Sequence, residues 1–86
     1  MGTQEPIRID APSALLGFFL ALRLQGCDAH VIGSEKAGWS VEIARDAPRE
    51  FVLDCVQRWL DDEALTRVVV HIDGVDVALS PRKRPA

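Results

Sequence analysis

His30 and Glu42 form the first pair of residues in this sequence that could do acid–base or ligand-binding chemistry. They fall in two alternating segments, residues 28–32 and 39–44, that predict the strands of an antiparallel hairpin. The register that brings the apolar residues of both strands to one face sets His30 opposite Glu42. A histidine beside an oriented carboxylate can transfer a proton or help to bind a metal.

A second histidine–carboxylate pair is predicted near the end of the chain. The segments Arg67–Ile72 and Val75–Leu79 flank Asp73-Gly74, a dipeptide that favours a two-residue type I′ hairpin turn. One register places the apolar residues of both strands on the same face, and it sets His71 opposite Asp76.

Both pairs also fit a plain solvated sheet face, on which cross-strand charges contribute only a few tenths of a kcal/mol. We expect the two pairs to lie far apart, near opposite edges of the sheet. The sequence contains neither the G-x-S-x-G elbow of a serine nucleophile nor a glycine-rich phosphate loop. No catalytic residue, resident metal or cofactor is therefore assigned.

The first helix, predicted from Ser13 to about Gln25, is unusually apolar. Ser13 can cap its N-terminus, and Gly26 can end it. Helices of a two-layer domain usually bury one apolar stripe, but this helix has two. We expect the second stripe to remain outside as an interaction surface, formed by Leu16, Leu20, Leu24 and Phe18.

The order of predicted elements is β-α-β-β-α-β-β, beginning with a strand at Ile7–Asp10 and with a second, amphipathic helix over residues 48–62. This order predicts an α+β, ferredoxin-like βαββαβ sandwich with one extra C-terminal strand. The expected antiparallel sheet order is 5-4-1-3-2, with both helices on one face. We expect one domain over residues 1–80 and a disordered basic tail over residues 81–86.

The segment Ile7–Leu16, together with Gly26 and the strand through Val31-Ile32, resembles the first half of an ACT domain. The second helix and the strand Val68–Ile72 extend the resemblance to about residues 7–73. It implies a regulatory module that binds an amino-acid-like ligand at a dimer interface. By this resemblance Pro12 and Ser13 are candidate ligand-binding residues, although the family usually has glycine where this chain has Ser13.

Composition narrows the class of partner. The net charge is −3, and three of the ten basic residues stand in the tail, so binding to nucleic acid is not expected. The longest apolar run, Ala14–Leu22, is too short to span a bilayer, which predicts a cytoplasmic protein without membrane contact. Cys27 and Cys55 are expected to be reduced core residues.

These observations together predict a non-enzymatic regulatory or protein-interaction module. It would self-associate as a homodimer, or dock on a larger protein, through the first helix, and it could take a small amino-acid-like ligand. The alternative is a small metal-binding protein or enzyme that uses the histidine–carboxylate pairs on the open face of the sheet.

Overall fold

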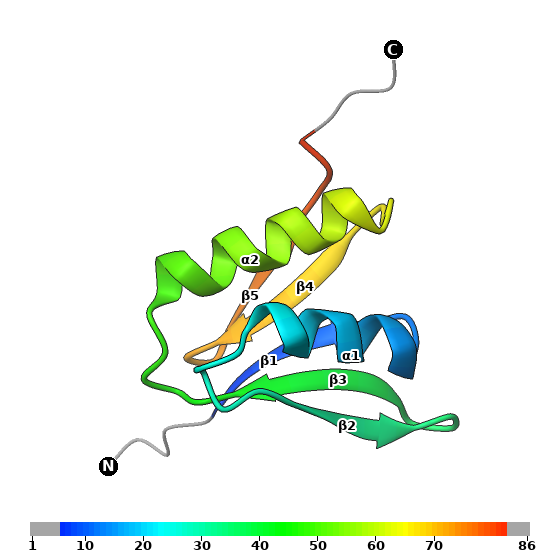
Figure 1. Ribbon diagram of the computed structural model, residues 1–86, viewed down its shortest axis with the longest axis horizontal. Coiled ribbons are helices and arrows are strands. Elements are labelled where there is room, and N and C mark those ends of the chain that lie inside the picture. Colours follow the sequence, from blue (N-terminus) through cyan, green and yellow to red (C-terminus); the bar gives the residue numbers. More distant parts are fainter. Residues whose placement is uncertain (1–5, 83–86) are drawn as a thin grey trace.

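The computed structural model describes residues 6–82, which form a five-stranded antiparallel sheet with two helices packed on one face (Figure 1). The elements in chain order are β1 (Ile7–Ala11), α1 (Ala14–Arg23), β2 (His30–Ser34), β3 (Gly38–Ile43), α2 (Arg49–Asp62), β4 (Val68–Ile72) and β5 (Val75–Leu79). This is the predicted α+β, ferredoxin-like sandwich.

The strand order is β2-β3-β1-β4-β5, which is the expected order read from the opposite edge. β1 lies at the centre and pairs antiparallel with both β3 and β4. The helices α1 and α2 run antiparallel to each other on one side, so the other side of the sheet is left open (Figure 1).

Alternation along the strands explains which side is covered. Ile7 and Ile9 of β1 are buried under the helices, whereas Arg8 and Asp10 point to the open face. The core continues through alternate residues of β3 and β4 and the inner sides of both helices, and includes Leu20, Leu24, Val41, Ile43, Val52, Val56, Trp59, Leu60, Val68, Val70 and Ile72. Cys27 belongs to this core and Cys55 is half-buried at its margin, both as free thiols.

The first helix is shorter than predicted. Ser13 caps it as expected, since its Oγ accepts a hydrogen bond from the backbone N–H of Leu16 at 3.2 Å. The helix ends at Arg23, and the chain then turns through residues 24–28. Asp28 has a φ of 56°, in the left-handed region outside the extended conformation of a regular strand, and β2 begins at His30 rather than at residue 28.

The β2–β3 hairpin has a tighter turn than the glycines at positions 33 and 38 suggest. Gly33 pairs with Trp39 and Ser34 pairs with Gly38, so only residues 35–37 lie outside the ladder. Gly33 has a φ of 122°, and a Cβ there would lie 2.1 Å from the carbonyl oxygen of Gly38. Only glycine fits at position 33 without moving the backbone of the opposite strand.

The β4–β5 hairpin agrees with the predicted register at every position, from Val68 opposite Leu79 to Ile72 opposite Val75. Its turn residues Asp73 and Gly74 have φ values of 52° and 76°. Two successive residues with positive φ are what a type I′ turn requires, as the Asp-Gly dipeptide predicted.

The residues that follow β5 are hydrogen-bonded to α2. Gln57 is buried on α2 and donates from Nε2 to the carbonyl oxygen of Ser80 at 2.8 Å. The backbone N–H of Arg82 donates to Asp61 Oδ1 at 3.1 Å. The first two residues of the predicted tail therefore lie against α2, and the remainder of that tail is outside the described residues.

No helix within residues 6–82 has the length and apolar character that crossing a membrane requires.

Candidate functional site

The outer side of α1 presents four large apolar side chains to solvent. Leu15 is 62% exposed, Phe18 55%, Phe19 38% and Leu22 48%. Their spacing of three, one and three residues places them on one side of a helix. We call these four residues the apolar face of α1. Isolated apolar residues on a surface are ordinary, whereas a contiguous group of this kind is a candidate interaction surface.

The rotation of α1 differs from the one expected. Leu20 and Leu24 were predicted to face outward, but both are fully buried, and Leu16 is half-buried against the core. Of the four predicted interface residues, only Phe18 is exposed. α1 does have an outward apolar stripe, as predicted. Three of the four residues assigned to that stripe, however, lie on the inner side of the helix.

Gly17 explains the rotation. A Cβ at this position would lie 3.4–3.5 Å from Ala11, Val31 and Val41, so the helix rests on β1, β2 and β3 through the glycine. Leu20 and Leu24 follow at the third and seventh positions after it and point to the same side. A glycine inside a helix that touches a sheet is a signal that could have identified Leu15, Phe19 and Leu22 as the outer residues.

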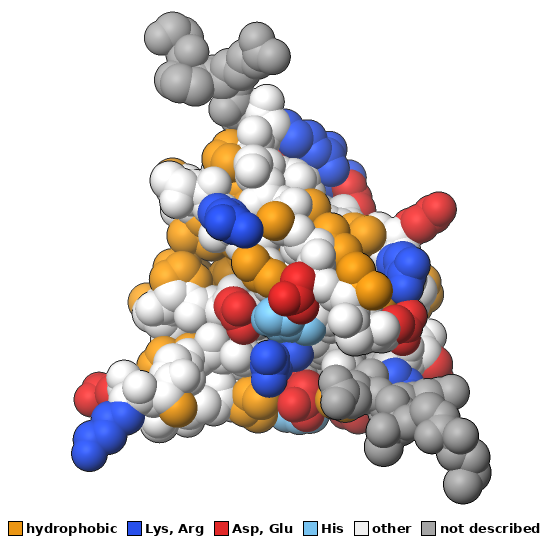
Figure 2. Space-filling view, turned by 180° about the vertical axis from the view of Figure 1, so that it is seen from behind, with side chains coloured by type: hydrophobic (Ala, Val, Ile, Leu, Met, Phe, Trp, Pro, Cys, Tyr) orange, Lys and Arg blue, Asp and Glu red, His pale blue; other side chains and the backbone are white. Residues whose placement is uncertain are grey.

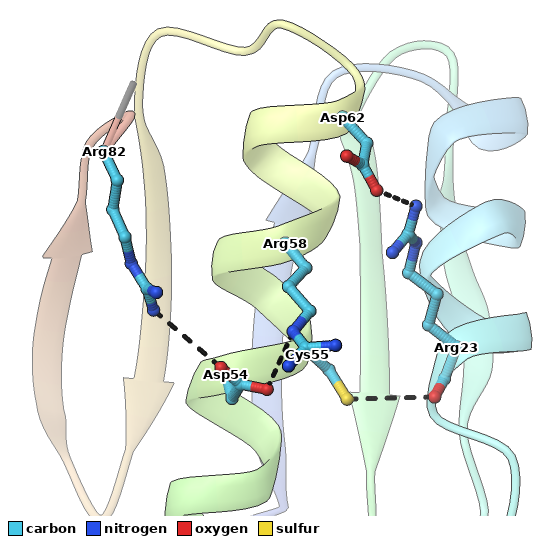
Figure 3. Close-up of polar contacts among 6 residues, drawn as sticks. All are labelled: Arg23, Asp54, Cys55, Arg58, Asp62 and Arg82. Atoms are coloured by element: carbon cyan, nitrogen blue, oxygen red, sulfur yellow. Dashed lines mark hydrogen bonds and ion pairs between the residues drawn. The ribbon is translucent and has the colours of Figure 1, made fainter. Parts of the chain in front are cut away.

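Polar contacts connect α1 to α2. Trp59 is fully buried, and its Nε1 donates to the backbone carbonyl of Leu16 at 2.9 Å. At the other end of α1, Arg23 pairs with Asp62 at 2.6 Å, and the Cys55 thiol lies 3.9 Å from the Arg23 carbonyl oxygen (Figure 3). Burial raises the pKa of the Cys55 thiol, which keeps it a neutral donor. The apolar face is thus presented by a helix anchored at both ends.

The open face of the sheet carries a second candidate site. Figure 2 shows this face, with histidine, acidic and basic side chains gathered near its centre and hydrophobic side chains around them. The strand registers explain the gathering, because one row of cross-strand neighbours runs across all five strands. In order from β2 to β5, that row is His30, Glu42, Arg8, His71 and Asp76.

His71 is the most tightly held member of this row. Its Nδ1 lies 2.6 Å from Asp76 Oδ1, and its Nε2 lies 3.1 Å from Asp10 Oδ2. The hydrogen bond to Asp76, and then the one to Asp10, raises the pKa of the His71 imidazole above its ordinary value of 6.5. Each ring nitrogen of His71 faces a carboxylate oxygen, an arrangement that favours the imidazolium, which can donate from both nitrogens.

The predicted pairs are both present, but they are closer together than expected. His71 and Asp76 are in direct contact, whereas His30 Nε2 lies 3.7 Å from Glu42 Oε1. Arg8 stands between the two pairs. Glu42, His71 and Asp76 line the same shallow pocket of about 310 Å³, together with Arg8, Pro6, Asp73 and Gly74.

The contacts of His71 with two carboxylates limit what this row of residues can bind. Because both His71 nitrogens are engaged by carboxylates, neither has a lone pair free for a metal ion. Residues 6–82 contain no group of three or more His, Cys, Asp or Glu side chains arranged to hold one. The row is better described as a charge ladder that connects five strands.

Pro12 and Ser13 lie away from this row, after the last residue of β1. Ser13 uses its hydroxyl to cap α1, and Pro12 lines a separate shallow pocket with Asp10, Ala11, Arg67, Val68 and Val69. The candidate ligand-binding residues are therefore divided between two places on the molecule.

The contacts of His71 with Asp10 and Asp76 predict that the stability of the protein depends on pH. Its pKa is raised in the folded protein, so the stabilisation is fully present below pH 6.5, the ordinary value, and is lost as pH rises through the folded pKa. We expect the free energy of unfolding in urea to fall as the pH rises above 6.5 and through the folded pKa of His71, by about 1 kcal/mol for such surface pairs.

The His71→Gln variant should lose this part of the pH dependence, whereas His30→Gln should keep it, since His30 has only one carboxylate nearby at 3.7 Å. Equal pH profiles for the wild-type protein and His71→Gln would contradict the assignment.

Comparisons of the chain with protein-family models, with curated proteins and with solved structures found no significant match.

Proposed function

We propose that this protein is a non-enzymatic interaction module that docks on other proteins through the apolar face of α1. One observation carries the proposal: Leu15, Phe18, Phe19 and Leu22 stand together in solvent on a helix of ten residues. Water contact with these side chains is unfavourable, and covering them contributes about 25 cal/mol per Å² of apolar surface.

The anchoring of α1 supports the proposal. A docking surface is most effective when its side chains are already positioned, because less conformational entropy is lost on binding. Trp59 and Asp62 of α2 contact the first turn and the last residue of α1. Between them, Gly17 lets the helix pack closely against the sheet.

The charged row on the open face supports the metal or enzyme alternative less well. His71 is fully engaged by Asp10 and Asp76, and Arg8 places a positive charge between the two histidine–carboxylate pairs. Binding of an amino-acid-like ligand is also less well supported, because the Ser13 hydroxyl already accepts the hydrogen bond that caps α1.

The test compares three immobilised proteins in an extract of the source cells: the wild type, Leu15→Glu and Val75→Glu. Leu15 and Val75 are matched in exposure, at 62% and 60%, but Val75 lies on the edge strand β5 while α1 packs over β1, β2 and β3. We expect the wild type and Val75→Glu to retain the same bound proteins and Leu15→Glu to lose them. Three identical sets of bound proteins would overturn the proposal.

A further inference from the structure

The apolar face of α1 has a self-complementary pattern. Its residues stand in the order Leu15, Phe18, Phe19 and Leu22, which reads the same in both directions about the midpoint between Phe18 and Phe19. In two helices related by a two-fold axis through that midpoint and running antiparallel, Leu15 of one lies beside Leu22 of the other. Phe18 then lies beside Phe19 of the other copy.

We propose that the partner of this face is a second copy of the chain, bound through α1 in an antiparallel, two-fold pair. The inference rests on the proposed function and names its partner. A two-fold interface uses the same patch on both subunits, so it needs a patch that complements itself. Leucines at both ends of a central pair of aromatic residues meet that condition.

Charge favours the same partner and the same orientation. Arg23 is the one charged residue of α1, and it is already paired with Asp62 of α2 at 2.6 Å. An uncharged apolar face fits a second uncharged apolar face, which this chain itself supplies. Antiparallel packing also separates the two Arg23 side chains and opposes the two helix dipoles, whereas parallel packing would bring like charges together.

The exposed area sets the expected strength. With a fully exposed Phe counted at about 150–250 Å² and a Leu near the lower end of that range, the four side chains expose roughly 400 Å² together. A stable protein interface buries about 800 Å² on each partner. The face therefore supplies about half of what a tight dimer needs. We expect a weak, reversible dimer rather than a tight one.

The first measurement is the solution mass of the purified chain by light scattering from about 10 µM to 1 mM. The wild type and Val75→Glu should change from monomer to dimer over this range. Leu15→Glu and Leu22→Glu should each weaken association at least about tenfold. A wild-type monomer throughout, or a dimer indifferent to both leucine substitutions, would overturn the inference.

The second measurement tests the orientation. In the double variant Leu15→Lys/Leu22→Glu, antiparallel helices bring opposite charges together and parallel helices bring like charges together. We expect the double variant to associate more strongly than either single variant, and a mixture of isotope-labelled and unlabelled wild-type chains to show contacts between Leu15 and Leu22 of different copies. Contacts between the two Leu15 side chains would overturn the antiparallel pair.

These outcomes separate the two proposals. If the purified chain stays monomeric while the extract still shows binding that depends on Leu15, the second copy is the wrong partner and the docking face stands. If neither experiment depends on Leu15, both proposals fail together.

Discussion

A glutamate in place of Leu20 is expected to unfold the protein, whereas a glutamate in place of Leu22 should leave the fold intact. The two positions are two residues apart on the same helix, but Leu20 is fully buried and Leu22 is 48% exposed. Leu20 packs in the core, where an ionised carboxylate would have no partner. Such a substitution costs more than about 4 kcal/mol, a large part of the 5–15 kcal/mol that stabilises a typical domain.

Urea unfolding followed by far-UV circular dichroism checks this difference. Leu22→Glu should unfold within about 1 kcal/mol of the wild type, as surface substitutions usually do. Leu20→Glu should show little native signal even without urea, and Leu20→Met serves as the control that keeps the volume and the apolar character. If Leu20→Glu folds normally and Leu22→Glu does not, the rotation of α1 is reversed.

The rotation of this helix is also where the sequence was least informative. One stripe of α1 consists of leucines and the other of leucines and phenylalanines, so hydrophobicity alone cannot choose between them. α2 presents no such ambiguity, since its charged residues mark one side and its buried residues Val52, Val56 and Trp59 mark the other. In α1 the choice is made by the close approach of Gly17 to the sheet, which is a tertiary contact.

The sheet could be predicted further than the helices. Each hairpin has one register that places its apolar residues on a single face, and both predicted registers are found. The strand order followed from the crossover rule. The missing step was the register of β1, because only its pairing with β3 and β4 places Arg8 between Glu42 and His71.

The contact of Asp10 with His71 was missed for the same reason. The two residues are diagonal neighbours on adjacent strands, and their side chains meet at 3.1 Å. Sequence reasoning paired His71 with Asp76 across a local turn, where the register is fixed by only two residues. The strands β1 and β4 are separated by most of the chain, so no local sequence pattern indicates the register of their pairing.

Trp59 is expected to contribute strongly to the packing of α1 on α2. Of all substitutions to alanine in α2, Trp59→Ala should lower the free energy of unfolding the most. Its indole is fully buried, and Nε1 donates to the Leu16 carbonyl oxygen at 2.9 Å. Trp59→Ala should lower the free energy of unfolding by about 3–5 kcal/mol, since it opens a large cavity and removes that bond. Trp59→Phe keeps most of the apolar contact and should cost about 1–2 kcal/mol.

The control is Trp39→Phe, at the half-buried tryptophan of the β2–β3 hairpin. Equal losses from Trp59→Phe and Trp39→Phe would mean that the bond to Leu16 contributes nothing. A larger loss at position 59 also bears on association, since the Leu16 carbonyl that Trp59 binds lies in the first turn of α1, directly after Leu15 of the apolar face. Trp59→Phe should then weaken the dimer at temperatures where the monomer is still folded, and light scattering beside circular dichroism would separate the two effects. That result would show that the docking face depends on the anchoring of α1 as well as on its four exposed side chains.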